Sequence, residues 1–379
     1  MTTQTEPCGL YLHFPFCRSK CAYCDFNSVP DRGAAARGVY LGALRAEVRG
    51  AAAVPVDTIF CGGGTPTVYA AEELAVTLAE VASRFTILEG AEISLEANPG
   101  TVDEAALRRL RLGGFNRLSL GVQSFNDRLL AGIGRIHSAK RAREAVAAAR
   151  AAGFTNLNLD LILGLPGEGE KWRDSVAQAI RLAPEHVSLY PLSVEEGTPL
   201  AEWVASEAVF LPEEDEVERR WRKAAAMLEA AGYRRYEISN FARPGFACRH
   251  NRRYWERREY LGLGAGAHSF LGSRRFWNVT AWEEYAARMQ AGENPQAGEE
   301  CLTAEEERGE AMILGLRLVE GISRRRFAAR YGSYPEEAFP LAVERLTANG
   351  MLHRRGDRLA LTARGRRLGN QAFAAFLPG

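Results

Sequence analysis

Short apolar segments alternate with amphipathic helical segments from residue 9 to about residue 230. Apolar segments of this length are typical of strands in a parallel sheet that helices cover. Strands are predicted at Gly9–Phe14, Thr58–Cys61, Glu92–Glu96, Arg117–Val122, Asn156–Leu161 and Val187–Leu192. Helices are predicted at Tyr40–Arg49, Ala71–Arg84, Asp103–Leu112, Ser138–Ala152 and Trp172–Leu182. Six such units predict a partial parallel (β/α)6 barrel of the TIM type, because a closed barrel needs eight.

The pattern changes after about Thr280. Helices are predicted at Glu305–Leu318, Ser323–Tyr331 and Glu336–Asn349, followed by a hairpin over Met351–Thr362. Three helices and a hairpin resemble a winged-helix module, a fold that often binds DNA. The apolar face of these helices is fully used, so packing against the barrel or a partner is favoured over DNA binding. We expect a core barrel at 1–240, a connecting segment at 241–280 and a C-terminal α+β domain at 281–379.

Composition and charge narrow the class of protein. Hydrophobic residues make up 46% of the 379 and charged residues 25%, as in ordinary globular proteins. The net charge of +1 gives no overall field that would attract nucleic acid or anionic lipid. The N-terminal residues include Glu6 and Pro7 and have no apolar core, so we do not expect them to act as a signal peptide, and no apolar run reaches the roughly 20 residues of a membrane span. We expect a cytoplasmic protein without a membrane span.

Three of the seven cysteines, Cys17, Cys21 and Cys24, lie within one short segment. An odd number of cysteines without a secretory signal argues against a disulfide framework. The C-x3-C-x2-C spacing supplies three thiolates, which can hold three irons of a [4Fe–4S] cluster and leave the fourth iron open. Zinc is the main alternative, but a closed zinc site needs a fourth ligand, and none lies nearby in the sequence. Cys248 lies two residues before His250, which is too few ligands for a metal site.

Polar residues fall where the predicted strands end. The cysteines follow the first strand, and Gly62-Gly63-Gly64-Thr65-Pro66-Thr67 follows the second. Glu96, Gln123 and Asp160 lie at or near the ends of the next three strands. Because the C-terminal strand ends of such barrels form the active face, these side chains are predicted to converge on one rim.

These motifs resemble the radical SAM enzymes, which cleave S-adenosylmethionine (SAM) at a [4Fe–4S] cluster. The resemblance covers nearly the whole chain and includes Cys-x3-Cys-x-Tyr-Cys-Asp-Phe at 17–26, Glu96-Ala97-Asn98-Pro99, Gly121–Phe125 and Asp160–Gly167. It implies that Cys17, Cys21 and Cys24 bind the cluster. It also implies that SAM contacts a further set of residues: Tyr11, Gly63, Gly64, Thr65, Glu96, Gln123, Arg135 and Asp160. Arg135, which we expect on a helix, suits the SAM carboxylate because guanidinium forms charge-assisted, often bidentate bonds.

Within this family the chain is most similar to heme chaperones, which are relatives of the oxygen-independent coproporphyrinogen III dehydrogenases. The dehydrogenase pattern has a further cysteine two residues beyond the third ligand, where this chain has Phe26, and a longer segment before the cluster loop. His250-Asn251-Arg252-Arg253-Tyr254-Trp255 matches the H-N-x-x-Y-W heme-binding motif of the chaperones. The resemblance implies heme binding by His250, Asn251, Tyr254 and Trp255. A histidine is a good axial ligand for heme iron, and aromatic rings offer apolar surface to a porphyrin.

The sequence thus predicts a heme chaperone that carries a [4Fe–4S] cluster and SAM, and whether it is also an enzyme stays open. One alternative is a coproporphyrinogen III dehydrogenase or another radical SAM enzyme acting on a tetrapyrrole. Another is a DNA-contacting regulator that uses the C-terminal module. The heme acceptor and the electron donor are not identified by the sequence. A respiratory acceptor would bring the chain transiently to a membrane.

Overall fold

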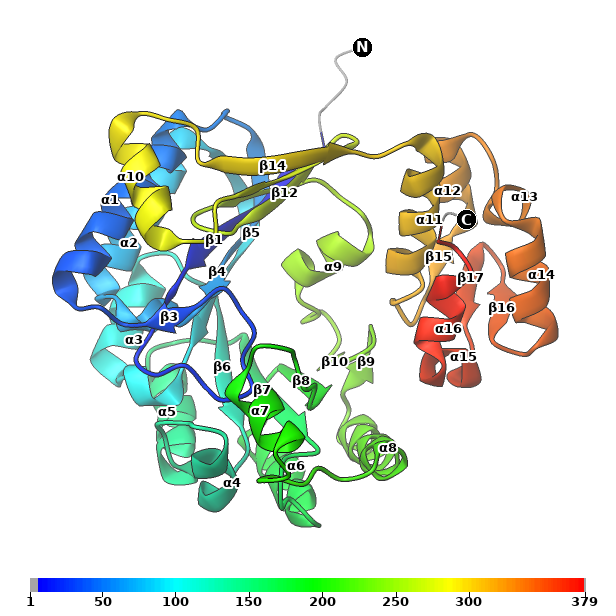
Figure 1. Cartoon of the computed structure of the whole chain (residues 1–379), viewed down its shortest axis with the longest axis horizontal. Coiled ribbons are helices and arrows are strands. Elements are labelled where there is room, and N and C mark those ends of the chain that lie inside the picture. Colours follow the sequence, from blue (N-terminus) through cyan, green and yellow to red (C-terminus); the bar gives the residue numbers. More distant parts are fainter. Residues whose placement is uncertain (1–5, 378–379) are drawn as a thin grey trace.

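The large sheet is built around six parallel strands in chain order, as the sequence predicts. The computed structural model describes residues 6–377. The six strands are β1 (Cys8–Phe14), β4 (Pro55–Gly63), β5 (Thr86–Ala97), β6 (Arg117–Gln123), β7 (Leu157–Leu163) and β8 (His186–Pro191). Each pairs in parallel with the next along the chain. The sheet curves, with its helices on the outer face (Figure 1).

Six helices cover the convex side because each is apolar on one face, while the short helices α4 and α7 lie apart from the main core. The covering helices are α1 (Ala34–Gly50), α2 (Ala71–Arg84), α3 (Glu104–Leu112), α5 (Ala139–Ala151), α6 (Lys171–Leu182) and α8 (Glu214–Ala230); α4 is Asp127–Gly132 and α7 is Pro199–Ala205. Apolar side chains of the strands and of the covering helices form one core, which includes Leu10, Ile59, Leu95, Leu118 and Leu159, all fully buried. The strand ends are thereby held on a rigid frame, so the loops that follow them are fixed in position.

Both edges of the sheet carry strands that the sequence pattern did not predict. On the β1 side, β11 (Tyr260–Leu263) is parallel to β1. It is followed by the antiparallel strands β12 (His268–Leu271), β13 (Arg274–Asn278) and β14 (Gln296–Cys301). On the β8 side lie β10 (Asn240–Ala242) and β9 (Arg234–Arg235). The strand order runs from β14 to β9 without closing, so the barrel is partial.

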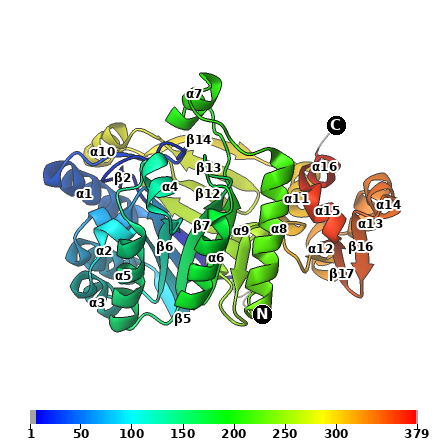
Figure 2. The same ribbon diagram turned by 90° about the horizontal axis from the view of Figure 1, so that it is seen from below.

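The C-terminal region has its own core and a small sheet, the α+β winged-helix-like arrangement predicted above. Its helices are α11 (Ala304–Gly315), α12 (Arg324–Tyr331), α13 (Pro335–Ala338), α14 (Pro340–Ala348), α15 (Ala363–Arg367) and α16 (Gly369–Ala374). Its strands are β15 (Ile322–Ser323), β16 (Leu352–Arg355) and β17 (Arg358–Leu361). This region lies at one side of the barrel in both views (Figures 1 and 2). Since α10 (Trp282–Ala291) and β14 pack on the barrel, we place the domain boundary after β14, later than residue 281.

One predicted helix is wrong in its extent. The sequence predicts a continuous helix at Glu336–Asn349, but the structure breaks it at Phe339 into α13 and α14. Pro340 has no backbone N–H to donate and disfavours helical geometry in the residue before it, which explains the break.

The short helix α9 (Arg249–Trp255) carries the histidine motif and contacts both β4 and α11. It therefore links the barrel to the C-terminal region. Within residues 6–377, no helix is both long and apolar enough to cross a membrane.

Candidate functional site

The three clustered cysteines lie together around one cavity. Cys17 ends β2 (Phe16–Cys17), which pairs with β3 (Val29–Pro30), and Cys21 and Cys24 lie in the loop between these strands. All three line a cavity of about 480 Å³, here called the thiol cavity. Burial raises the pKa of Cys17 and Cys24, and the neighbouring thiols add to this rise. A cationic metal centre would relieve this cost by holding the sulfurs as thiolates.

The thiols are not yet arranged as a closed metal site. Within residues 6–377, no three His, Cys, Asp or Glu side chains form a group that could hold a metal ion as they stand. Two of the sulfurs already accept hydrogen bonds: Thr65 Oγ1 donates to Cys17 Sγ at 3.3 Å, and Arg135 Nη1 donates to Cys21 Sγ at 3.4 Å. The three thiols fit an iron–sulfur cluster with three cysteine ligands. Hydrogen bonds to the ligand sulfurs, such as these two, help set the reduction potential of a cluster.

The glycine turn after β4 forms one wall of the thiol cavity. Gly64 N donates to Phe14 O at 2.7 Å and Thr65 N to Phe16 O at 2.9 Å, so the turn lies against the cysteine loop. A Cβ at Gly64 would lie 2.8 Å from the carbonyl oxygens of Phe14 and Pro15. Only glycine allows this approach of two backbones.

Two partly buried carboxyl groups line the thiol cavity. Burial, with Asp160 as the second cause, raises the pKa of Glu96 to about 8, so Glu96 is mostly protonated at neutral pH. It accepts a hydrogen bond from Gly63 N at 3.2 Å and can donate one to a ligand. Asp160 accepts from Ser119 Oγ at 3.1 Å and from Asn158 Nδ2 at 2.7 Å, and burial raises its pKa as well.

Gln123 and Arg135 also line the thiol cavity. Gln123 has φ of +65°, a backbone conformation that is uncommon outside glycine and often found at functional sites. Arg135 is not on a helix as expected; it lies in the loop between α4 and α5. Its guanidinium bonds to Gly121 O and Cys21 Sγ, while its buried Nε has no partner. A fixed cation with a free donor suits a carboxylate ligand.

The residues of the histidine motif do not share one surface. His250, Asn251 and Tyr254 line a second cavity of about 200 Å³ inside the barrel, here called the inner cavity, together with Tyr11. Trp255 instead lines a cleft of about 940 Å³ between α9 and the C-terminal region. In that cleft region the guanidinium of Arg317 stacks over the Trp255 ring at 4.5 Å. The structure therefore separates Trp255 from the rest of its motif.

His250 is buried and neutral. It is 1% exposed, and burial, with the charges of Arg253 and Arg117, lowers its pKa to about 3. Its Nδ1 lies 2.9 Å from Thr58 Oγ1 and its Nε2 2.9 Å from the Tyr254 hydroxyl. A neutral imidazole can coordinate iron, but a metal at Nε2 would have to replace Tyr254.

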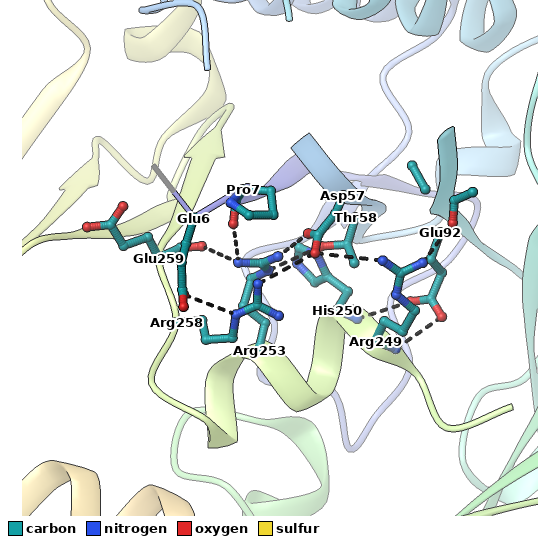
Figure 3. A network of polar contacts seen from close by, with 12 residues as sticks. Glu6, Pro7, Asp57, Thr58, Glu92, Arg249, His250, Arg253, Arg258 and Glu259 are labelled. Atoms are coloured by element: carbon teal, nitrogen blue, oxygen red, sulfur yellow. Dashed lines mark hydrogen bonds and ion pairs between the residues drawn. The ribbon is translucent and has the colours of Figure 1, made fainter. Parts of the chain in front are cut away.

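Buried charges fix α9 against the barrel (Figure 3). Glu92 on β5 accepts hydrogen bonds from the backbone N–H groups of Arg249 and His250, both at 3.0 Å, at the helix N-terminus. Arg253 is 1% exposed, pairs with Asp57 and donates to the carbonyl oxygens of Pro7 and Glu259. These bonds hold the face of α9 that carries His250 toward the inner cavity.

The thiol cavity and the inner cavity adjoin. Both are lined by Glu96, Ser119, Asp160 and Tyr190. Of the residues expected to contact SAM, seven line the thiol cavity: Gly63, Gly64, Thr65, Glu96, Gln123, Arg135 and Asp160. Tyr11 lines only the inner cavity, where its hydroxyl lies 3.1 Å from His13 Nδ1.

Sequence reasoning missed several residues of these cavities. Ser119 and Arg117 lie on β6 two and four residues before Gly121, on the inward face that also carries Gln123. The signal was present as polar residues at every second position of an otherwise apolar strand. Tyr190, at the end of β8, follows the same strand-end rule that identified Glu96.

Comparison with known proteins agrees with this fold and cavity. Residues 11–180 match the family model described as the Radical SAM superfamily, and residues 302–368 match the HemN C-terminal domain. The structure of coproporphyrinogen III oxidase (HemN) from Escherichia coli superimposes with a TM-score of 0.85 at 24% identity. It covers 98% of this chain and 90% of that chain, and shows the shared fold. The chain is a radical SAM protein, a class that implies a [4Fe–4S] cluster and SAM.

Curated relatives define the family more narrowly. Heme chaperone HemW of Mycobacterium tuberculosis (strain H37Rv) is 40% identical, over 98% of this chain and 95% of its own length. Heme chaperone HemW of Bacillus subtilis is 37% identical over 97% and 98%, and that of Escherichia coli 34% identical over 98% of both. The chain belongs to the heme chaperone HemW family.

Proposed function

We propose that this protein binds heme beside a SAM-loaded [4Fe–4S] cluster and transfers the heme to an acceptor protein, without efficient coproporphyrinogen dehydrogenase activity. One observation carries the proposal: the cysteine loop and the His250 face of α9 line two cavities that share four residues. Heme held at His250 would therefore lie next to the cofactor site.

The residues around the thiol cavity would take two roles, holding the cluster and binding SAM. Cys17, Cys21 and Cys24 would hold three irons, with the loop drawing together as the cluster assembles. When bound and reduced, the cluster supplies the electron that cleaves SAM. Gly63, Gly64 and Thr65 would lie along SAM, with Gln123 and Asp160 bonding its polar groups. Protonated Glu96 would donate a hydrogen bond, and Arg135 would bind the carboxylate.

Heme binding at His250 requires α9 to move. The inner cavity, at about 200 Å³, is smaller than the roughly 300–1,000 Å³ of pockets that enclose ligands of drug size. A macrocycle would reach Nε2 only when α9 opens away from β4, which separates His250 Nδ1 from Thr58. Tyr254 lies on the same helix, so its side chain would also have to rotate away from Nε2. Asn251 would then face the ligand, and the Trp255 ring in the interdomain cleft would line its path.

Phe26 supports a chaperone over a dehydrogenase. It is 60% exposed at the thiol cavity, at the position where the dehydrogenase pattern has a further cysteine. No sulfur is present there to take part in chemistry. We expect the cluster-loaded protein with SAM and a reductant to form no protoporphyrinogen IX from coproporphyrinogen III under anaerobic conditions. Sustained formation of that product would overturn this part of the proposal.

Heme titration tests the binding site directly. The cluster-reconstituted protein is titrated anaerobically and followed by the Soret band, with His250→Ala as the variant. We use His268→Ala as the control, because His268 lies at the surface and stacks on Trp277 outside these cavities. We expect saturation near one heme per chain, binding at least about tenfold weaker in His250→Ala and no change in the control. Equal affinity in all three proteins would contradict the assignment of His250.

A further inference from the structure

Arg117 is a buried cation without a direct anionic partner. It begins β6 and is 2% exposed. Among the described residues 6–377, no ion pair holds its guanidinium, and its buried Nε has no hydrogen-bond partner. Arg253, which is equally buried, pairs with Asp57 and bonds two carbonyl oxygens. Buried charges are costly unless they are paired, so the contrast calls for an explanation.

The groups around Arg117 do not satisfy its donors. Burial lowers the pKa of Arg117, and the nearby Cys248, Glu92, Tyr236 and Asp160 more than offset this. The oxygens of Glu92 already accept from the N–H groups of Arg249 and His250. Glu96 accepts from Gly63 N, and Asp160 accepts from Ser119 and Asn158, so neither carboxyl group bonds to Arg117. His186 and His250 line the same cavity but supply no negative charge, and their ring nitrogens already have hydrogen-bond partners. Arg117 therefore presents free, charged donors to the inner cavity.

The shape of the cavity limits what can approach these donors. Arg117 lines the inner cavity with Asn158, Ser188 and Asn240, which add polar contacts. About 200 Å³ accommodates a short side arm of a ligand whose larger part lies outside. The cavity adjoins the thiol cavity on one side and carries His250 on another. Guanidinium binds planar carboxylates with two parallel hydrogen bonds.

We infer that Arg117 binds a carboxylate of the ligand carried in the barrel, and that this carboxylate is a propionate arm of the porphyrin. The identity of the ligand rests on the proposed function, whereas the carboxylate chemistry rests on Arg117. The arm would enter the inner cavity as α9 opens, and Arg117 would anchor it while His250 binds the iron.

A comparison of heme with its dimethyl ester tests the anchor. Esterification removes both negative charges and leaves the macrocycle intact. Cluster-reconstituted wild type, Arg117→Met and Arg117→Lys are titrated with both ligands, and iron content and SAM binding verify that each variant is folded. In the wild type we expect the ester to bind about 10- to 100-fold more weakly than heme, as for loss of a charged hydrogen bond. Arg117→Met should bind both ligands equally weakly, and Arg117→Lys, which keeps the charge without the planar donor pair, should be intermediate.

The outcomes separate this inference from the proposed function. If the wild type binds no heme, both fail. If it binds heme but Arg117→Met shows the same ester effect as the wild type, the anchor alone is refuted, whatever the stability of the variants. Thermal protection by potassium propionate that disappears in Arg117→Met, with no ester effect on heme, would identify a small carboxylate as the ligand and overturn the porphyrin assignment.

Discussion

The ion pair between Asp57 and Arg253 should control both the stability of the barrel and the opening of α9. Asp57 on β4 also faces Arg249 and Arg258, at 3.7 and 3.6 Å. The change Asp57→Asn keeps the shape of the side chain and removes the carboxylate that Arg249, Arg253 and Arg258 share. Arg258 still faces Glu6, at 3.7 Å. Only Arg253 is fully buried, so most of the cost arises there.

The expected magnitude follows from burial. Removing one partner of a buried ion pair costs about 3–5 kcal/mol, because the remaining charge is left without compensation. Arg253→Met should cost about 3 kcal/mol, since Asp57 keeps its two partly exposed arginines while the carbonyl oxygens of Pro7 and Glu259 lose a donor. The double variant should be more stable than the sum of the two losses by about 2 kcal/mol, because neither charge is then left alone.

Urea unfolding of the cluster-free protein, followed by circular dichroism, measures these differences. The control is Arg108→Ala, which breaks a half-exposed pair with Glu104 on α3 and should cost below about 0.5 kcal/mol. The rate of heme association gives a second readout. Asp57→Asn should lower the stability but raise this rate, because the substitution loosens α9. A coupling energy below about 0.5 kcal/mol, or slower association, would refute the reasoning.

Two further predictions test the frame around the site. Glu47 is partly buried and accepts hydrogen bonds from Tyr285, Asn278 and Gly264, and loss of solvation raises its pKa from 4.5 to about 7. The folded state therefore holds this proton more tightly. The contribution of Glu47 to stability is fully present below pH 4.5, and about 3 kcal/mol of it is lost as the pH rises from 4.5 through 7. Glu47→Gln should flatten that part of a pH series of unfolding midpoints, and an unchanged slope would contradict the assignment. Gly64→Ala should cost about 1–3 kcal/mol and weaken SAM binding, because its Cβ meets backbone oxygens at 2.8 Å. Calorimetry measures the stability and the SAM affinity of this variant. The control is Gly132→Ala, where the added Cβ meets nothing within 4 Å, and equal losses in both variants would contradict the crowding at Gly64.

The strands and helices of the barrel can be predicted from the apolar pattern of short sequence segments. The bounds predicted for α2 coincide with those of the structure, and each of the six parallel strands overlaps its prediction. Apolar runs between glycine or proline breaks are a strong signal when both faces of a strand are buried. By contrast, β14 has the sequence Gln-Ala-Gly-Glu-Glu-Cys and is mostly exposed. An edge strand of this kind has no apolar run to reveal it.

The cavity residues were predictable only where a general rule applies to them. The strand-end rule places Glu96, Gln123 and Asp160 on one rim, and the structure brings them to one cavity. The division of the histidine motif between two sides of α9 depends on a tertiary contact. Glu92, 157 residues earlier in the chain, sets that contact by bonding Arg249 N. No local pattern specifies such a pair.

The buried charges around α9 follow a single physical logic. Apolar side chains of similar volume would often give equal or greater stability than buried ions. Asp57 and Arg253 form a pair, and Glu92 accepts backbone hydrogen bonds, so these three charges act on the position of the helix. Arg117 does neither, although it is as deeply buried. Charges satisfied within the protein fix α9 in the closed position, and the unsatisfied charge favours the anionic ligand that enters when α9 opens. The opening of α9 and ligand binding are thereby coupled. Breaking the Asp57–Arg253 pair costs free energy, and the binding of a carboxylate to Arg117 offsets that cost.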